Sequence, residues 1–360
     1  MMLARPPATT TWPAPDVPAT ESPATDSRAL PPPSGRPAPL RSPRRWPVRA
    51  AGAILLAAAL LMNRSGAFVV VALFVLVVPF ERLFPRHRQP LRRPELATDV
   101  AYGLAAPALR IASVVVGVAV GICSLAWLPG LALRPLVAAL PGPARLVLGV
   151  ILLDVTTYWL HRFAHEVPFL WRFHAVHHST TRLDWASGLR AHPLDGAFLA
   201  PPLVLLLAAG FPLRLTGGLA AVQVVLDLFL HANVRWRWRL LHRVVITPEF
   251  HHWHHANEAD AHNTNYSVLL PLWDQLFGTY FMPAGRRPMR YGIDEPMPTG
   301  MVHQLRYPLR GLPPARRLVL AAARHPVRSA GQLGRAVRRG VGQMWASARR
   351  PTRRFLDWRA

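Results

Sequence analysis

Histidine is the residue type in this chain that is best suited to chemistry, and it is gathered into three short groups. The groups read HRFAH, HAVHH and HHWHH, and their spaced members are His161 and His165, then His174, His177 and His178, then His251, His254 and His255. Residues three and four apart share one face of an α-helix, because each residue turns the helix by about 100°. Each group is therefore predicted to present two or three imidazoles toward a common point.

Such clusters are costly beside apolar segments unless a bound group satisfies them. Mutual repulsion keeps clustered imidazoles neutral, and neutral imidazole is a metal ligand. One catalytic zinc needs only about three protein ligands. The eight grouped histidines exceed that number, which indicates two metal ions. Nitrogen ligands suit iron, zinc or copper, so at this point the element stays open.

Long apolar segments precede the histidines and must position them. Several approach or exceed the roughly 20 residues that cross a bilayer; they lie at 51–80, 105–128, 145–160 and 198–230. The formal net charge of +24 would by itself suit nucleic acid or an anionic membrane surface. A nucleic-acid-binding protein has no use for such segments, so we predict a multi-pass membrane protein without a nucleic-acid partner.

Arginines that flank the apolar segments predict the topology. They lie on both sides of 51–80, which places both ends of that segment on the cytoplasmic face by the positive-inside rule. Residues 102–128 would then cross outward, and 143–160 would return and bring His161 to the cytoplasmic face. GFPLR at 210–214 interrupts the stretch 193–230 and predicts a hairpin. All histidine groups would then share the cytoplasmic face.

The histidine groups are followed by NYS and PLWDQLFGTY, and with them residues 95–283 resemble the fatty acid hydroxylase/sterol desaturase family of membrane di-iron oxygenases. The resemblance rests on three histidine motifs in order, on their separations and on the trailing WDQLFGT segment. It implies an all-α fold: a helical membrane bundle of about four spanning helices, or hairpins equivalent to them, with a cytoplasmic histidine-rich cap. Ser267 departs from the glycine that usually follows Asn-Tyr in the family.

The resemblance also implies an activity and its cofactors. Members hydroxylate or desaturate a lipid with O2 as co-substrate, two iron ions, and electrons from a separate donor such as a ferredoxin and its reductase. The eight histidines of the three motifs, together with His231 in HAN, match the family's metal ligands. His192 in RAHPLD is a possible ligand or a partner of one, and so are Asp154, His242 and His252. No separate catalytic acid or base is expected beyond the metal centre.

Composition divides the rest of the chain. We predict a disordered Pro/Arg-rich leader at 1–48, a membrane hairpin with a basic linker at 49–94, the catalytic domain at 95–283 and an Arg-rich tail at 284–360. The single cysteine, Cys123, lies in an apolar segment and excludes a disulfide framework or a thiolate metal site.

Two other function classes use histidine. A zinc-dependent membrane hydrolase would need an activating carboxylate near its metal, and no HExxH motif occurs. A metal transporter or metal sensor would place histidines along a path through the membrane, whereas here they gather at the ends of apolar segments. Both remain alternatives to the lipid oxygenase.

Overall fold

The computed structural model describes residues 64–311, apart from 91, 126, 199 and 239–240, together with residues 335, 338, 339, 342 and 346. The predicted leader, most of the apolar segment 51–80 and most of the predicted tail lie outside the described residues. The described part is helical, with two isolated bridges (Pro85 with Val234, and Ala256 with Tyr291) and no strand. The predicted all-α fold class is confirmed for these residues.

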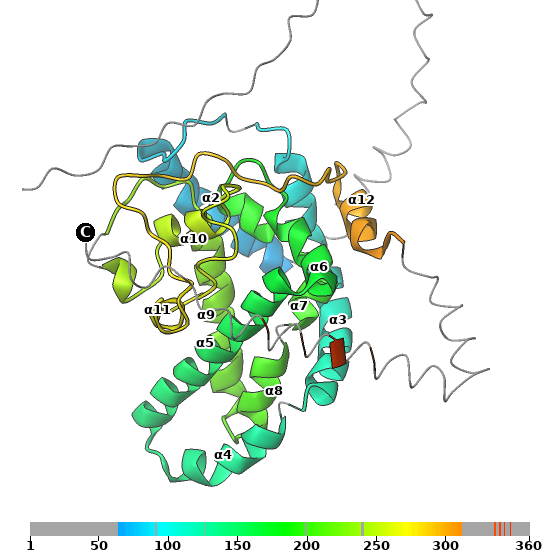
Figure 1. Ribbon diagram of the computed structural model, residues 1–360, viewed down its shortest axis with the longest axis vertical. Helices are drawn as coiled ribbons and strands as arrows, with labels where there is room; N and C mark the ends of the chain where they lie inside the picture. Colours follow the sequence, from blue (N-terminus) through cyan, green and yellow to red (C-terminus); the bar gives the residue numbers. More distant parts are fainter. Residues whose placement is uncertain are drawn as a thin grey trace, which may run out of the picture. The chain divides into compact units, whose positions relative to one another are not determined.

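Eleven α-helices and three short 3₁₀ turns make up the described part (Figure 1). The α-helices are α2 (Arg64–Leu83), α3 (Leu96–Cys123), α4 (Trp127–Ala139), α5 (Gly142–Glu166), α6 (Pro168–His178), α7 (Pro193–Phe198), α8 (Ala200–Ala208), α9 (Leu213–Leu230), α10 (Pro248–His254), α11 (Leu272–Leu276) and α12 (Met301–Arg306). The 3₁₀ turns are η1 (Trp185–Leu189), η2 (Leu241–Arg243) and η3 (Tyr307–Leu309).

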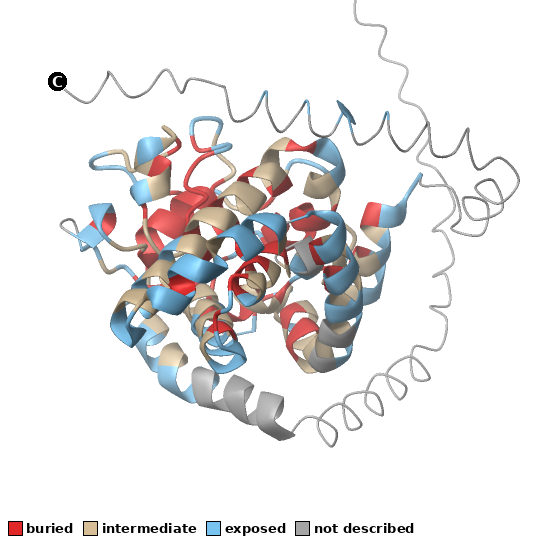
Figure 2. Cartoon of the chain, turned by 90° about the horizontal axis from the view of Figure 1, so that it is seen from below, coloured by how far each residue is buried: buried red, intermediate tan, exposed pale blue. Residues whose placement is uncertain are grey.

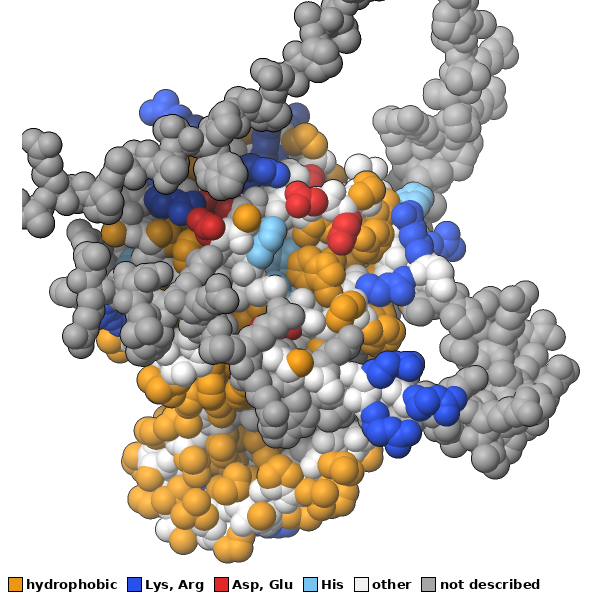
Figure 3. Space-filling view, in the orientation of Figure 1, with side chains coloured by type: hydrophobic (Ala, Val, Ile, Leu, Met, Phe, Trp, Pro, Cys, Tyr) orange, Lys and Arg blue, Asp and Glu red, His pale blue; other side chains and the backbone are white. Residues whose placement is uncertain are grey.

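The apolar half is built from α4, α8, the second half of α3 and the first halves of α5 and α9. Its core holds Val137, Leu153, Leu206, Ala209 and Phe211. Large apolar side chains nevertheless stay exposed on its outer surface, among them Val115, Leu131, Val147, Leu213 and Val222. Figure 3 shows hydrophobic side chains covering this half, whereas charged and histidine side chains gather on the other half. Figure 2 shows buried residues concentrated between the helices. An exposed apolar surface of this kind is suited to contact with lipid.

Two helices are long and apolar enough to cross a membrane, namely α5 and α9. A third candidate is the pair formed by residues 112–123 of α3 and by α4, which meet at a bend of 82°. Leu125 lies in this bend with a left-handed φ of 57°, so residues 102–128 do not form one continuous helix. The predicted interruption at 210–214 is confirmed, because Gly210 has a φ of 85° and α9 starts after Pro212.

Proline also turns the chain between the first two histidine groups. Val167 is extended, and Pro168 follows it as the first residue of α6. Proline disfavours a helical conformation in the residue before it, so α5 ends there, and its fixed φ suits the first position of a new helix. Helices α5 and α6 pack against each other. The second histidine group is thereby folded back beside the first.

Candidate metal centre

Four helices bring nine histidines together at the end of the structure away from the apolar half. They come from the last turns of α5, from α6, from the C-terminal cap of α9, and from α10 with its own C-terminal cap. Thr247 caps helix α10 by accepting from the Phe250 N–H, and Pro248 follows as the first residue of the helix.

The nine side chains form two adjoining groups. The first group holds His161, His165, His174, His178 and His254, and the second holds His177, His231, His251 and His255. In each group one ring nitrogen of every member lies within 4.8 Å of those of the others. The rings of His178 and His255 stack with their centroids 4.1 Å apart, which joins the two groups. All nine residues that the sequence assigned to the metal thus lie together.

Helical geometry explains how each motif is divided. Residues four apart differ by about 40° around a helix, whereas a residue three further on lies about 60° the other way. His174 and His178 accordingly share the first group, and His177 points to the second. Helix α10 does the reverse, because His251 and His255 join the second group and His254 joins the first. The sequence analysis expected each motif to point at one centre, whereas the structure divides both three-histidine motifs between two.

Hydrogen bonds on the outer side of the rings determine where the protons lie. Four rings use Nδ1 to donate to a backbone carbonyl: His161 to Tyr266 at 2.7 Å, His177 to Arg190 at 2.9 Å, His231 to Asp227 at 2.6 Å and His254 to Thr264 at 3.0 Å. A carbonyl oxygen only accepts, so Nδ1 carries the proton in each ring. In a neutral imidazole Nε2 is then a bare lone pair. His174 makes the corresponding bond from Nδ1 to the Asp195 carboxylate at 3.0 Å.

The bare nitrogens face one another inside each group. Nε2 of His161 lies 3.2 Å from Nε2 of His174, and Nε2 of His177 lies 3.2 Å from Nε2 of His231. Two lone pairs at this distance cannot form a hydrogen bond without a proton between them. Nε2 of His165 and Nε2 of His254 are buried without any hydrogen-bond partner. A cation in each group would satisfy these atoms, and all-nitrogen donor sets suit iron, zinc or copper.

Burial keeps the rings neutral. It lowers the pKa of His177 to about 4, and the neighbouring His231 contributes in the same direction. Burial likewise lowers the pKa of His231 to about 4. Both imidazoles are therefore unprotonated near pH 7, which is the form that binds a metal ion.

The three histidines considered as possible ligands lie outside both groups. His192 donates from Nε2 to the Leu305 carbonyl and accepts from the Leu194 N–H, so both of its nitrogens are used by backbone. His252 pairs with the Ala232 carbonyl and the Tyr291 hydroxyl. His242 contacts the hydroxyl of Thr247, the residue that caps α10. Their contacts are those of residues that support the surrounding backbone.

Asp154 supports the grouped histidines indirectly, by holding a loop that contacts one of them. Its carboxylate accepts from the N–H groups of Leu269 and Leu270 and from the indole of Trp273. Asp274 holds the start of the same loop by accepting from the N–H of Tyr266. The Tyr266 carbonyl in turn accepts from His161, so the two carboxylates fix the acceptor of a grouped histidine.

Sequence reasoning missed two further carboxylates beside the rings. Asp195 is the partner of His174, and the Asp227 carboxylate lies 3.7 Å from Nδ1 of His231. Asp227 could have been noticed, because it is an acid inside the apolar stretch 198–230, four residues before a grouped histidine. An acid at such a place needs a partner.

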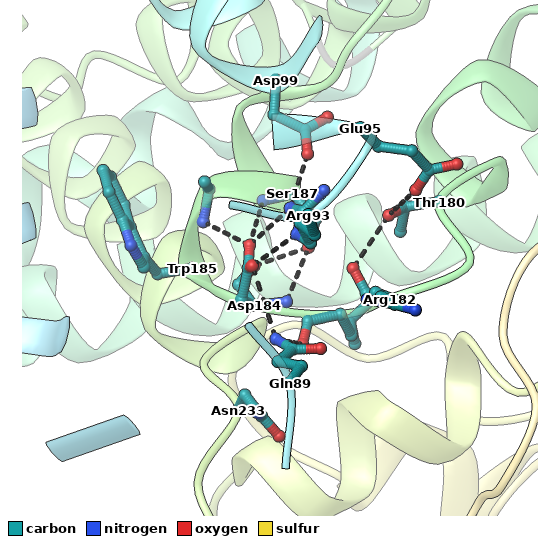
Figure 4. Close-up of polar contacts among 12 residues, drawn as sticks. Gln89, Arg93, Glu95, Asp99, Thr180, Arg182, Asp184, Trp185, Ser187 and Asn233 are labelled. Carbon is teal, nitrogen blue, oxygen red and sulfur yellow. Dashed lines mark hydrogen bonds and ion pairs between the residues drawn. The ribbon is translucent and has the colours of Figure 1, made fainter. Parts of the chain in front are cut away.

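A buried ionic network adjoins the residue that holds His177, and Figure 4 shows its members Arg93, Asp99 and Asp184. Arg93 donates to both carboxylate oxygens of Asp184 at 2.6 Å and to Asp99 at 2.6 Å. Asp99 also accepts from the side chain of Arg190 at 2.6 Å, and Arg190 donates to the Ser179 hydroxyl at 2.9 Å. The backbone carbonyl of Arg190 holds His177, so the network connects the N-terminus of α3 to the second histidine group.

Comparison with known proteins is consistent with this geometry. Residues 146–279 match the family model described as fatty acid hydroxylase. An ornithine lipid hydroxylase of Rhizobium tropici is 37% identical over 47% of this chain and 51% of its own length. The human alkylglycerol monooxygenase is 28% identical over 41% of this chain and 32% of its own length. A putative Delta(7)-sterol-C5(6)-desaturase of Arabidopsis thaliana is 26% identical over 39% of this chain and 50% of its own length.

The chain spans about half of the length of these relatives, or less. No solved structure matches it. The segment matched by the family model includes all nine grouped histidines, since His161 is the first of them and His255 the last. Residues 146–279 of this chain are thus similar to the fatty acid hydroxylase family.

Proposed function

We propose that this protein is a membrane oxygenase that hydroxylates or desaturates a C–H bond of a lipid, with O2 as co-substrate. The observation that carries the proposal is the pair of adjoining histidine groups whose bare Nε2 atoms converge, in a segment that matches the fatty acid hydroxylase family. The nine grouped histidines are the proposed ligands of two iron ions. The proposed catalytic domain is 95–283.

The reaction balances as R–H + O2 + 2 e⁻ + 2 H⁺ → R–OH + H2O, and the electrons come from a one-electron donor protein such as a ferredoxin with its reductase. Two bound iron ions would supply the dioxygen activation that an unreactive C–H bond requires. The residues of the chain hold the proposed ligands in place. Carbonyl acceptors hold the rings of His161, His177, His231 and His254 in fixed orientations. Asp195 orients the ring of His174 by accepting from its Nδ1–H.

The proposed membrane arrangement follows from the two halves of the structure. The exposed apolar surface of α4, α5 and α9 would lie among lipid chains, and the histidine groups would lie at the interface on the cytoplasmic side. The full bundle would contain about four spanning helices or equivalent hairpins. A lipid could then reach the histidine groups without leaving the bilayer.

The donor set favours the oxygenase over both alternatives. A catalytic zinc site uses about three protein ligands and leaves a position for water. Among the described residues the two groups contain five and four histidines and no carboxylate, which exceeds what a zinc hydrolase needs. A transporter would distribute its ligands along a path, but these histidines gather in two adjoining groups.

Metal analysis combined with isotope incorporation tests the function. The full chain, purified in detergent after expression with iron, should contain about two irons per chain. Incubation with lipid, a ferredoxin system and ¹⁸O2 should place ¹⁸O in a lipid alcohol or yield an alkene that forms only with O2. One zinc per chain with no iron requirement for turnover would overturn the proposal.

A further inference from the structure

A pocket of about 300 Å³ reaches the histidine groups from the polar half of the structure. His165, His178, His254 and His255 line it together with Trp171, and residues 256–257, 262–263 and 292–295 complete its wall. Two of these histidines, His254 and His255, are 5% and 2% exposed, and each has one ring nitrogen without a hydrogen-bond partner. The pocket is therefore an approach to the proposed metal centre that is distinct from the apolar surface.

The charge of the pocket differs from that of the chain. The protein has 42 basic and 18 acidic residues, yet among the described residues no arginine lines this pocket, whereas Asp294 and Glu295 do. Asp294 accepts from the side-chain amide of Asn257 at 2.8 Å. The guanidinium of Arg290 lies 3.7 Å from this carboxylate in a pair whose side chains are 71% and 77% exposed, so water screens this interaction. This exposed arginine therefore offsets the electrostatic potential of the Asp294 carboxylate only weakly.

The residues that line the pocket favour a ligand with a positive charge. Binding sites for phosphate and carboxylate groups use arginine, lysine or backbone N–H groups. Carboxylates and amide oxygens instead accept hydrogen bonds from an ammonium group. Trp171 adds an aromatic wall, with its ring 5.2 Å from that of His165 and 5.6 Å from that of His178. Tryptophan is the side chain that attracts a cation most strongly through its ring face.

Bound iron would place positive charge at the histidine end of the pocket and repel a cation there. A cationic group must then sit at the end formed by Asp294 and Glu295, and the adjoining carbon atoms would extend toward the histidines. We propose that this pocket binds the amine-bearing, cationic headgroup of the lipid substrate, so that oxidation occurs on a carbon close to the headgroup. This inference rests on the proposed oxygenase function and adds the substrate class to it.

The test uses choline and its uncharged carbon isostere, 3,3-dimethylbutan-1-ol. Choline carries a permanent cation that cannot coordinate a metal, and the two probes have nearly the same shape. The iron-loaded full chain is placed in phosphatidylglycerol nanodiscs, because this lipid has no amine that would compete. Calorimetry should give a dissociation constant for choline about 10-fold lower than that for the isostere, because only choline gains charge–charge and cation–π attraction. Choline methyl protons should also be broadened by the paramagnetic iron.

Variants locate the binding site. The double substitution Asp294→Asn and Glu295→Gln removes both charges and keeps the acceptor for Asn257; it should weaken choline binding about 10-fold and leave the isostere unchanged. Asp260→Asn removes an acid that pairs with Arg286 outside this pocket, and should leave choline binding unchanged. Equal affinities for the two probes, or wild-type choline affinity in the double variant, would overturn the headgroup site.

The same preparations separate this inference from the function on which it rests. Iron content and ¹⁸O incorporation are measured in parallel with choline binding. A chain with two irons that oxidises an amine-free lipid and does not distinguish choline from its isostere refutes the headgroup site alone. Selective choline binding by a chain that binds no iron supports the pocket's preference for cations and refutes the oxygenase.

Discussion

The backbone carbonyl of Arg190 accepts the Nδ1 proton of His177 at 2.9 Å, while the guanidinium of Arg190 is held by Asp99 at 2.6 Å. One residue therefore joins a buried ion pair to a grouped histidine. The orientation of the His177 ring depends on charges that begin at the N-terminus of α3, far from the histidine motifs in the sequence.

Asp99→Asn should accordingly lower both stability and metal content. The substitution leaves the buried Arg93 and Arg190 with less compensation, and breaking a buried ion pair costs about 3–5 kcal/mol. We expect earlier thermal unfolding and loss of metal from the second group before the first. Arg290→Gln, which breaks an exposed pair, is the control and should change little. Wild-type unfolding and full metal content in Asp99→Asn would contradict the role of the network.

Removal of one histidine from each group should abolish turnover. His254→Ala takes a member from the first group and His177→Ala one from the second, and each should reduce iron below two per chain while the protein still inserts into membranes. Iron content and lipid oxidation are measured together. His303→Ala, at an exposed position outside both groups, should behave as wild type. Retained turnover in both group variants would refute the ligand assignment.

Asp195→Asn should weaken the first group without removing a ligand. The carboxylate accepts from Nδ1 of His174 at 3.0 Å, and loss of such outer partners costs about 10- to 100-fold in metal affinity or activity. Titration of the metal-free protein with iron should show the weakened site. An affinity unchanged from that of the wild type would mean that the carboxylate does not act on the metal site.

Gly188→Ala should disturb His231 through contact alone. A Cβ at position 188 would lie 3.0 Å from Nδ1 of His231 and 3.2 Å from a methyl group of Leu228. The ring must shift, so we expect reduced metal content in the second group and lower turnover. Gly217→Ala is the matched control, because a Cβ there meets nothing within 4 Å. Equal metal content in the two variants would show that the ring can yield without losing its ligand position.

Lowering the pH should destabilise the metal-free protein within a defined pH range. Burial lowers the pKa of His177 and of His231 to about 4 in the fold, whereas an unfolded histidine titrates near pH 6.5. The unfolded chain therefore binds more protons between these values, and stability falls as pH decreases from about 6.5 toward about 4. Thermal unfolding in detergent should be nearly constant from pH 8 to pH 7 and then decline. A flat profile down to pH 5 would contradict the neutral, buried state of these rings.

Much of the site could be predicted because its information is local. The spacing of His174, His177 and His178 places them on one side of a helix whatever surrounds it. The interruption at 210–214 can likewise be predicted from the turn-forming residues Gly210 and Pro212. The division of each motif between two centres could not be predicted in this way. It depends on how α6 and α10 face each other, and that follows from packing between distant segments.

The outer hydrogen bonds were beyond sequence reasoning for a similar reason. The acceptor of His161 is the carbonyl of Tyr266, and any residue type supplies a carbonyl. No side-chain pattern marks such a partner. The bend at Leu125 could not be predicted from residue type either, because an apolar residue rather than glycine adopts the left-handed conformation there.

Helix α5 is at once a candidate membrane span and the carrier of His161 and His165. Its 25 residues form one continuous rod with a rise of about 1.5 Å per residue, so a sliding or tilting of the rod displaces both rings together. A bilayer that is too thick or too thin for the apolar part of this rod exerts force on it. In the proposed membrane arrangement, bilayer thickness would therefore be mechanically coupled to the position of two proposed iron ligands, and acyl-chain length in the host bilayer should alter the proposed lipid oxidation.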